Sequence, residues 1–231
     1  MSRLTEKYIQ KQSVQFLKDH YENKFEIEIG FAKQEVRTNK ENRGKRADGL
    51  LCFHSSRQKE HTVSIEAKSH KTLGSLLAYW DDDKLMKQFL LFAFPVGLMT
   101  IYFTSSMAWY WISLIALGSF LLSIALFVII TFFLELDGHK VVNVVNQVNQ
   151  YPANEKWIAI SMDSLNLTHN KKSEFYKNNN FDNFTRKCKN QNIGILIVTR
   201  RKNEILLHPN YIKGKYLDCY CLNENIRSIL N

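Results

Sequence analysis

The feature that most constrains this chain is a stretch from Phe89 to Leu134 with no Asp, Glu, Lys, Arg or His over 46 residues. About 20 apolar residues suffice for one helix to cross a bilayer, so this stretch is long enough for two crossings. Its middle, "TSSMAWYW", combines small polar residues with an aromatic cluster typical of a membrane interface. We therefore expect a hairpin of two transmembrane helices, residues 87–104 and 109–134, with Pro95 bending the first.

The alternative for this stretch is a pair of very apolar helices inside a soluble core. The second half, "ISLIALGSFLLSIALFVIITFFL", is apolar all the way round and carries no polar stripe, which favours the membrane. Basic residues flank the hairpin on both sides, while the loop between its helices is uncharged: Lys84, Lys87, His139 and Lys140. The positive-inside rule then places both flanks in the cytoplasm. We expect a multi-pass protein of the bacterial inner membrane, with one cytosolic domain (1–86 and 136–231) interrupted by the hairpin (87–135).

The charge balance of the chain points to a polyanionic partner. It has 31 Lys and Arg against 22 Asp and Glu, a formal net charge of +9. Such an excess is typical of proteins that bind nucleic acid or an acidic membrane surface. The four cysteines have no zinc-finger spacing and no secretory signal precedes them, so reduced thiols are expected: Cys52, Cys188, Cys219 and Cys221.

Hydrophobic periodicity outside the hairpin predicts alternating helices and strands. The expected helices are residues 4–22, 73–88, 139–151 and 172–190, the third stopped by Pro152. The expected strands are residues 25–36, 49–55, 62–68, 156–162, 193–199 and 205–209. This order predicts an α/β fold with a mixed sheet flanked by helices, and places the hairpin in the crossover after the third strand.

Two acids and a lysine are expected to meet at one end of this sheet. Alternation along the strand 62–68 places Glu66 and Lys68 on one face, and the apolar residues between them on the core face. The polar segment "SSRQKEH" predicts an antiparallel turn, and a turn centred near Gln58 would set Asp48 opposite Lys68. A register shifted by two residues is equally compatible with the pattern.

The chemistry of these three side chains suits phosphodiester hydrolysis. Two neighbouring carboxylates attract a hard divalent cation such as Mg²⁺. A bound cation activates water and polarises a phosphoryl group, and a nearby lysine stabilises the charge that develops on the phosphate.

The pattern formed by Asp48 and, after a strand-length gap, Glu66-Ala67-Lys68 resembles the PD-(D/E)XK, restriction-endonuclease-like nucleases. Mrr-type restriction enzymes and the nuclease-related domain are the two branches it is most similar to. The family's first proline is replaced here by Ala47, as in many members. The resemblance implies a helix–three strands–helix–strand core. It also implies that Asp48, Glu66 and the Ala67 carbonyl coordinate Mg²⁺ or Mn²⁺, with Lys68 as the catalytic lysine.

A second element is similar to a Gln-x₃-Tyr motif on the crossover helix of some family branches. Gln147 and Tyr151 are four residues apart, so one helical face would present both to the site. The resemblance implies catalytic roles for this pair and a metal-binding role for Glu6, as a third acid in the first helix. A solvated surface carboxylate is the alternative that residue type favours for Glu6. His70 shares the face of Lys68, as a ligand, a proton carrier or an ordinary surface histidine.

Basic residues gather in four clusters. Arg43, Lys45 and Arg46 lie just before Asp48, where contacts to a phosphate backbone are expected. The other three clusters suit DNA or anionic lipid headgroups equally: Lys171–Lys172, Arg186–Lys189 and Arg200–Lys202. No zinc finger, helix-turn-helix signature or aromatic stacking motif predicts sequence-specific base reading.

The sequence thus predicts a membrane-anchored, Mg²⁺-dependent endonuclease that hydrolyses DNA, with defence against foreign DNA as its biological role. Two alternatives stay open: an inactive nuclease fold that serves as a DNA-binding or scaffold protein, and a membrane-perturbing effector whose soluble domain is a sensor. The expected partners are DNA and the lipid bilayer, together with a second copy of the chain or further subunits of a defence system. A channel is disfavoured because no ionisable residue would line a pore.

Overall fold

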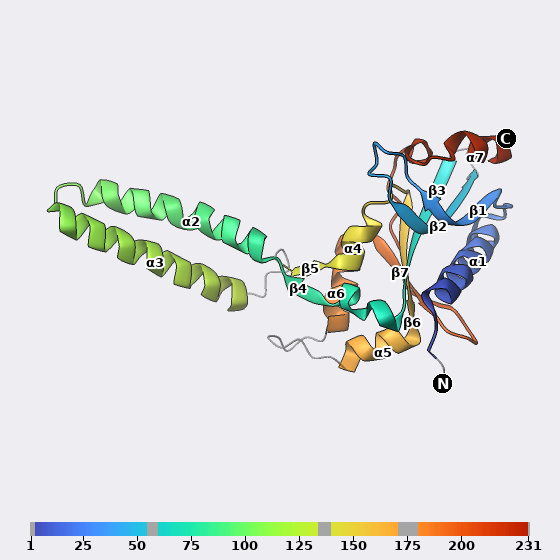
Figure 1. Cartoon of the computed structure of the whole chain (residues 1–231), viewed down its shortest axis with the longest axis horizontal. Helices are drawn as coiled ribbons and strands as arrows, with labels where there is room; N and C mark the ends of the chain where they lie inside the picture. The colour runs from blue at the N-terminus through green and yellow to red at the C-terminus, as the bar shows by residue number, and fades with distance from the viewer. Residues whose placement is uncertain (1–2, 55–59, 134–139, 171–179, 231) are drawn as a thin grey trace. The chain divides into compact units, whose positions relative to one another are not determined.

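A computed structural model describes residues 3–54, 60–133, 140–170 and 180–230. The chain forms two compact units (Figure 1). The first consists of Met1–Ala78 together with Val142–Asn231, and the second is the intervening segment Tyr79–Val141. The second unit is therefore an insertion in the chain of the first. The boundaries expected from the sequence, 87 and 135, fall inside this inserted segment.

The first unit is built on a six-stranded mixed sheet with the order β1-β2-β3-β6-β7-β8 (Figure 1). Its strands are β1 (Phe31–Arg37), β2 (Arg46–His54), β3 (Glu60–Lys68), β6 (Glu155–Ser161), β7 (Ile193–Val198) and β8 (Glu204–Leu207). β3, β6 and β7 are parallel to one another, whereas β1–β2, β2–β3 and β7–β8 pair antiparallel. Parallel neighbours require a crossover connection, and the inserted unit lies within the crossover from β3 to β6.

Helices cover both faces of this sheet. They are α1 (Glu6–Phe25), α4 (Asn143–Val148), α5 (Met162–Asn170), α6 (Asn180–Asn190) and α7 (Asn223–Leu230), with the 3-10 helices η1 (His70–Leu76) and η3 (Leu217–Cys219). α1 packs along one face, where its apolar side chains join those of β2, β3 and β6. The other face is covered in two separate patches, by α4 and α6 over β6 and β7 and by η3 and α7 over β1 and β2.

The strip between these two patches coincides with the polar side of β3, which α4 and η3 both contact. Alternate residues of this strand, Thr62, Ser64, Glu66 and Lys68, are polar and buried. The residues between them, Val63, Ile65 and Ala67, pack against α1 with Leu51 and Phe53 of β2. The expected apolar face of this strand pair is confirmed. The architecture therefore leaves buried polar groups of β3 facing a seam between helices.

The register of β2 and β3 differs from the expected one. Gly49 pairs with Ile65 and Leu51 with Val63, so continuing the ladder sets Asp48 opposite Glu66 and not opposite Lys68. The expected turn centre was one residue too far along the chain. The connecting residues 55–59 contain no Gly or Asn-Gly signal that would fix a turn type, and they lie outside the described residues.

Helix α1 begins where its sequence offers an N-cap. The Thr5 side chain accepts a hydrogen bond from the Tyr8 N–H, and Glu6 places a negative charge in the first turn. The helix ends at Phe25, followed by Glu26 in the left-handed conformation with φ 54°. It is therefore longer than the expected helix 4–22. For the same reason, the strand expected over 25–36 is shortened to β1.

The segment before the hairpin is not the single helix expected over 73–88. It forms η1, then β4 (Ala78–Trp80), and only then the helix α2 (Asp82–Phe103). Leu77 is extended with ψ 139°, which interrupts the helix. Asp81 caps α2 by accepting a hydrogen bond from the Lys84 N–H, so the acidic run starts the helix instead of lying inside it.

Two further differences concern the second half of the chain. The helix expected over 139–151 is divided into the strand β5 (Lys140–Val142) and the short helix α4. The helix expected over 172–190 is confirmed where it is described, as α6, and residues 172–179 lie outside the described residues. The pattern also did not predict α5, η3 and α7, since each is shorter than the windows in which helical periodicity is clear.

The second unit contains two long apolar helices, α2 and α3 (Trp109–Phe133). Both are long and apolar enough to cross a membrane. Phe89 and Phe92 of α2 contact Phe120 and Phe127 of α3 through their rings. Most other large side chains of the pair point outward; Leu91, for example, is 79% exposed. Apolar surface of this extent is unusual on a soluble protein and is favourable in lipid.

Candidate functional site

The two acids and the lysine predicted from the sequence lie together at the carboxyl end of β3. The Lys68 Nζ is 2.6 Å from the Glu66 Oε1, and both side chains are almost fully buried. Asp48 of β2 reaches the same place, because its Oδ2 accepts a 2.7 Å hydrogen bond from the Ala67 N–H. All three charged groups therefore surround one peptide unit of β3.

Asp48 is fixed from a second side by α1. The Gln10 Nε2 donates a 2.7 Å hydrogen bond to the Asp48 Oδ1. Each oxygen of this carboxylate thus accepts one hydrogen bond, from the first helix and from β3. Gln10 was not predicted, since it is 38 residues from its partner; the only available signal was its position four residues after Glu6 on α1.

The electrostatics of the acid pair favour proton or cation uptake. Burial raises the pKa of Glu66, repulsion from Asp48 raises it further, and the pKa reaches about 7 although Lys68 partly offsets the shift. Burial also raises the pKa of Asp48, against the hydrogen bond from Ala67 and the charge of Lys68. Within the described part of the chain, no well-formed hydrogen bond reaches the Glu66 Oε2, although an interaction between Glu66 and the Tyr151 hydroxyl lowers the pKa of Glu66 in part. A buried carboxylate with an unsatisfied oxygen is a costly arrangement that a bound cation relieves.

Tyr151 belongs to this cluster. Its side chain is buried, and burial together with the charges of Glu66 and Asp48 raises its pKa. Tyr151 lies beyond the end of α4, in a turn where its N–H donates to the Val148 carbonyl. Helix α4 therefore ends before Tyr151, whereas the expected helix included this residue. The turn after α4 still directs the Tyr151 phenol to the acids.

The other half of the Gln-x₃-Tyr motif is less well connected. Gln147 lies in the last turn of α4, and α4 packs on β3. Its Oε1 is buried and finds no hydrogen-bond partner among the described residues. After the Glu66 Oε2, this is the second oxygen near the site without a hydrogen bond, and it lies on α4, the helix that flanks the site. The Nδ1 of His70, at the start of η1, is likewise buried without a described partner.

Glu6 lies at the edge of the acid pair. Its Oε2 accepts a 3.3 Å hydrogen bond from the Thr72 hydroxyl of η1, and its charge contributes to raising the pKa of Asp48. Among the described residues, no group of three or more His, Cys, Asp or Glu side chains is arranged to hold a metal ion. Glu6 therefore lies close enough to Asp48 to act on it through its charge.

The residues present nevertheless suit a hard divalent cation. Mg²⁺ takes oxygen ligands, needs only one or two carboxylates and retains several waters. Asp48 supplies one carboxylate, Glu66 supplies a second with an unpartnered oxygen, and repulsion between them would be relieved by positive charge. The Ala67 peptide lies between the two acids along β3. Mg²⁺ or Mn²⁺ would be held by these groups with water completing the coordination.

A strained strand residue lies across the sheet from Asp48. Glu35 of β1 has φ 56°, and the β1–β2 ladder pairs Gln34 with Gly49 and Val36 with Ala47 but skips Glu35 and Asp48. Glu35 also holds Arg46 at 3.5 Å. Left-handed backbone at a non-glycine residue costs about 1–2 kcal/mol and is often found at functional sites.

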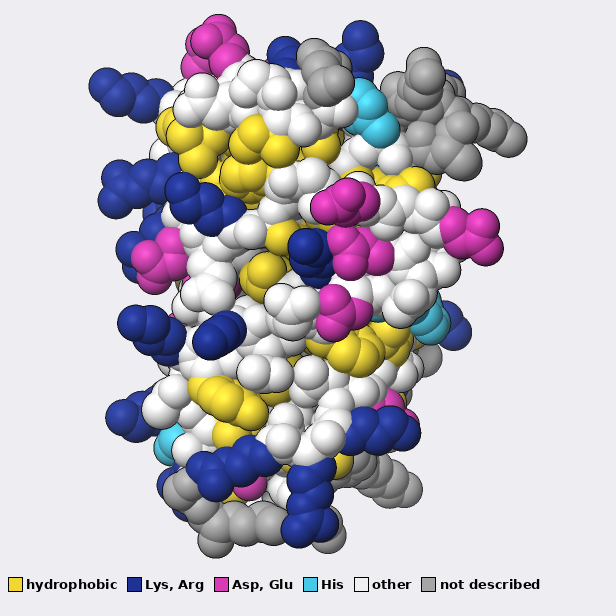
Figure 2. Space-filling model, turned by 90° about the vertical axis from the view of Figure 1, so that its right-hand side faces the viewer, with side chains coloured by type: hydrophobic (Ala, Val, Ile, Leu, Met, Phe, Trp, Pro, Cys, Tyr) yellow, Lys and Arg dark blue, Asp and Glu magenta, His cyan; other side chains and the backbone are white. Residues whose placement is uncertain are grey.

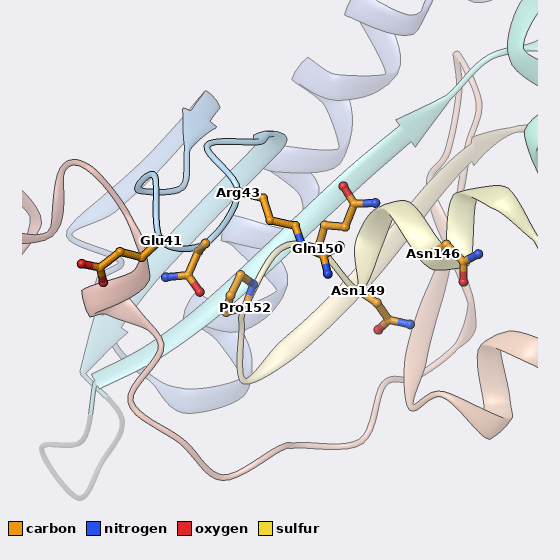
Figure 3. Close-up of a pocket in the computed structure, with 7 residues that line it drawn as sticks. Glu41, Arg43, Asn146, Asn149, Gln150 and Pro152 are labelled. Atoms are coloured by element: carbon orange, nitrogen blue, oxygen red, sulfur yellow. The ribbon is translucent and has the colours of Figure 1, made fainter.

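The basic residues before Asp48 are placed differently from one another. The charge of Arg46 lies close enough to Tyr151 to lower its pKa slightly against the larger upward effect of burial. Lys45 is exposed on the β1–β2 loop. Arg43, with φ 70°, lines a pocket of about 560 Å³ between that loop and the end of α4 (Figure 3).

This pocket is polar, and Glu41 lines it together with Arg43 and several amide side chains. Asn146, Asn149 and Gln150 line its α4 side, and Figure 3 shows the side chains of Arg43 and Gln150 next to each other. Tyr151 is flanked in the chain by two lining residues, Gln150 and Pro152. Amides and a guanidinium are typical groups for contacts to phosphate and sugar oxygens.

No protein-family model, curated protein or solved structure matches the chain. The chemistry of the site has to be inferred from its geometry. That geometry combines an acid pair, an adjacent lysine and, on neighbouring chain segments, a pocket lined by amide, guanidinium and carboxylate groups.

Proposed function

We propose that the protein is a Mg²⁺-dependent nuclease with a restriction-endonuclease-like fold, which hydrolyses phosphodiester bonds in DNA. The observation that carries this proposal is the cluster of half-buried Asp48 with buried Glu66 and Lys68, in which no well-formed hydrogen bond reaches one Glu66 oxygen and the pKa of Glu66 is about 7. Perturbed carboxylates with a specific charged neighbour are candidates for catalysis. The sheet order and the helices on both faces agree with the proposed fold.

Each group has a role in this proposal. Asp48 and Glu66 would hold the cation, which would supply a bound water of lowered pKa and would polarise the phosphoryl group. Lys68, positioned by its contact with Glu66, donates to the attacking water or to a phosphate oxygen. Gln10 and the Ala67 N–H hold the Asp48 carboxylate in one orientation. Tyr151, buried beside the acids, contacts a phosphate oxygen or a bound water through its hydroxyl.

The proposal includes a membrane anchor. α2 and α3 would cross the bacterial inner membrane as a hairpin, leaving both halves of the first unit in the cytoplasm. Arg43, Lys45 and Arg46 would contact the DNA backbone, and a tethered enzyme would meet DNA as it enters the cell. Defence against phage or plasmid DNA follows as the biological role. Deletion of the gene should then raise phage infection or plasmid uptake, and unchanged values of both would contradict this role.

The biochemical test is cleavage of supercoiled and linear DNA by the full chain in neutral-lipid nanodiscs. We expect cutting with Mg²⁺ or Mn²⁺, no cutting with EDTA, and loss of cutting in Glu66→Ala and Lys68→Ala. Lys215→Ala, an exposed lysine in the same unit, is the matched control. Metal-independent cutting, or cutting that survives Glu66→Ala, would overturn the proposed mechanism. Bound but uncut DNA with every metal would favour an inactive, DNA-binding nuclease fold.

A further inference from the structure

A second hollow of the first unit lies between α1 and the edge strand β1, with a volume of about 530 Å³. Three lysines and three glutamines contribute to its lining: Lys11, Lys18, Lys33, Gln12, Gln15 and Gln34. None of the described residues that line it is acidic. The side of the molecule that carries α1 is rich in Lys and Arg side chains (Figure 2). We refer to this hollow as the lysine groove.

The positive charge of the lysine groove is largely uncompensated. Lys11 and Lys33 are exposed and form no ion pair with the described residues. Lys18 lies 3.6 Å from Glu22 in the next turn of the same helix, a partly exposed pair that contributes little. Clustered cations on a concave surface focus the electrostatic field and concentrate anions there. The groove is therefore suited to an anionic ligand.

The floor of the groove reaches the chain segment next to Asp48, on the face of the sheet that α1 covers and not on the face of Glu66 and Lys68. Val14 lines the groove and packs onto Gly49, the residue that follows Asp48; a side-chain carbon at Gly49 would lie 2.6 Å from the Val14 Cγ2. Gln34, at the groove, pairs with Gly49 across the β1–β2 ladder. From the same helix, Gln10 donates to Asp48. A ligand in the groove would lie beside the chain segments that hold the first acid.

We propose that the lysine groove binds the phosphate backbone of the nucleic acid that flanks the scissile bond. This inference rests on the proposed function, because it assumes a nucleic-acid substrate. Lys11 and Lys18 are seven residues apart on α1, about 10 Å along the helix axis. That spacing covers about three nucleotides of a strand that rises 3.4 Å per nucleotide. The glutamines supply neutral donors for phosphate and sugar oxygens.

Nucleic acid fits this groove better than an anionic lipid surface does. A bilayer presents a broad surface that suits exposed, protruding basic residues, whereas a strand can lie within a hollow. The floor of the groove also continues to the segment that carries Asp48, and a substrate strand must extend beyond the reacting phosphate on both sides. Lipid binding is the competing outcome in the test.

The test is the salt dependence of DNA binding. Fluorescence anisotropy of a labelled duplex is measured against KCl for the full chain in phosphatidylcholine nanodiscs, with Glu66→Gln in every sample to block cleavage. Replacing Lys11, Lys18 and Lys33 together by Gln should weaken binding and reduce the slope of log K against log[salt] by about 2–3, since each phosphate contact contributes about 0.9. The matched control replaces the exposed residues Lys189, Lys213 and Lys215 by Gln, which removes the same charge. Its slope should change by less than about 1.

Three outcomes overturn the inference. One is a slope unchanged in the groove variant, and another is an equal change in both triple variants, which would indicate only net charge. The third is a groove variant that binds DNA normally but loses binding to phosphatidylserine vesicles, which would assign the groove to lipid. Thermal unfolding of each variant checks that the fold is intact. Metal-dependent cleavage by the otherwise unmodified chain is measured separately. Cleavage together with an unchanged salt slope in the groove variant rejects only DNA binding by the lysine groove. A reduced slope without cleavage rejects only the proposed nuclease activity.

Discussion

Opposite ends of the neighbouring strands β3 and β6 each carry a buried acid. At their amino ends lies Glu155, which contacts Tyr21 of α1 and His61 of β3. At the carboxyl end of β3 lies Glu66, which contacts Lys68. Both glutamates are buried in the same sheet, so the two sites show how the same residue type behaves with different partners.

The amino-end acid accepts a hydrogen bond through one oxygen, and its other oxygen lies at ion-pair distance from a histidine without a hydrogen bond. Tyr21 donates to the Glu155 Oε2, and the His61 Nε2 lies 3.5 Å from the Oε1. The Trp157 Nε1 donates in turn to the Tyr21 hydroxyl at 2.8 Å. Burial by itself raises the pKa of Glu155, but the His61 and Tyr21 partners outweigh it and hold the pKa below its usual value. This network stabilises the charged carboxylate.

The carboxyl-end acid lacks such a network. One Glu66 oxygen contacts Lys68, and no well-formed hydrogen bond reaches the other in the described structure. Burial and repulsion from Asp48 raise the pKa of Glu66, in the direction opposite to that of Glu155. A buried acid that its partners hold in the charged form contributes to the fold, whereas a buried acid with a raised pKa and an open oxygen is expected where a ligand completes the set. The comparison assigns structure to the Glu155 end and function to the Glu66 end.

The largest expected effect is on catalysis. Asp48→Asn and Glu66→Gln should each lower kcat/KM for Mg²⁺-dependent DNA cleavage by about 10³-fold or more, because each removes a carboxylate that would hold the cation. Glu155→Gln should change kcat/KM by less than about threefold at temperatures where the variant is folded, since Glu155 lies at the other end of the strands. Initial rates of plasmid nicking measure both. Equal losses in Glu66→Gln and a folded Glu155→Gln would contradict the comparison.

The next effect is on stability. Here a variant at the Glu155 end should lose more than a variant at the Glu66 end. Tyr21→Phe should destabilise the protein by about 2–3 kcal/mol, because it removes the donor to Glu155 and the acceptor of the Trp157 N–H. The melting temperature should fall by about 4–12 °C. Tyr151→Phe, at the other end, should cost less than about 1 kcal/mol. Thermal unfolding in a mild detergent gives both values. A larger loss of stability in Tyr151→Phe than in Tyr21→Phe would contradict the structural role assigned to the Glu155 end.

How much of this could be read from the sequence differs between the two ends. The alternation of residues 62–68 places Glu66 and Lys68 on one face, and the short sequence distance to Asp48 brings in the first acid. Gln10 and the Tyr21–Glu155 pair depend on contacts 38 and 134 residues apart, which no local pattern specifies. The three-residue strands β4 and β5 are too short for alternation to show. Local periodicity therefore predicted the strands of the site but not the helix that orients it.

The pH dependence of stability should also separate the two ends, measured without divalent cations. Glu66 has a pKa of about 7 in the folded protein against a usual 4.5, so the folded state binds more protons between these values. Glu66 therefore lowers the free energy of unfolding as pH rises from about 4.5 to about 7, by at most about 1.4 kcal/mol per pH unit. Glu66→Gln should flatten this fall.

Glu155 gives the opposite slope. Its folded pKa lies below the usual 4.5, so its contribution is present above that pH and is lost as pH falls through the folded pKa. Glu155→Gln should flatten the acid side of the profile and leave the range from 4.5 to 7 unchanged. Melting temperatures against pH for the two variants test both signs, and identical profiles would remove the electrostatic distinction.

The smallest expected effect concerns Glu6. Glu6→Gln should change the apparent affinity for Mg²⁺ by less than about threefold, because Glu6 acts on Asp48 through charge and contacts Thr72 instead of the acid pair. Asp19→Asn, an exposed acid on the same helix, is the control. A loss of more than about 30-fold in Glu6→Gln, roughly 2 kcal/mol, would instead make it a metal ligand.

Direct cation binding tests the central claim most simply. Mn²⁺ is titrated calorimetrically into the full chain in neutral-lipid nanodiscs, beside Glu66→Gln and Glu155→Gln. The account predicts binding by the unmodified chain, the same binding by Glu155→Gln, and loss of that binding in Glu66→Gln. No binding by the unmodified chain, or binding that survives Glu66→Gln, would contradict the assignment of the carboxyl end of β3 as a cation site.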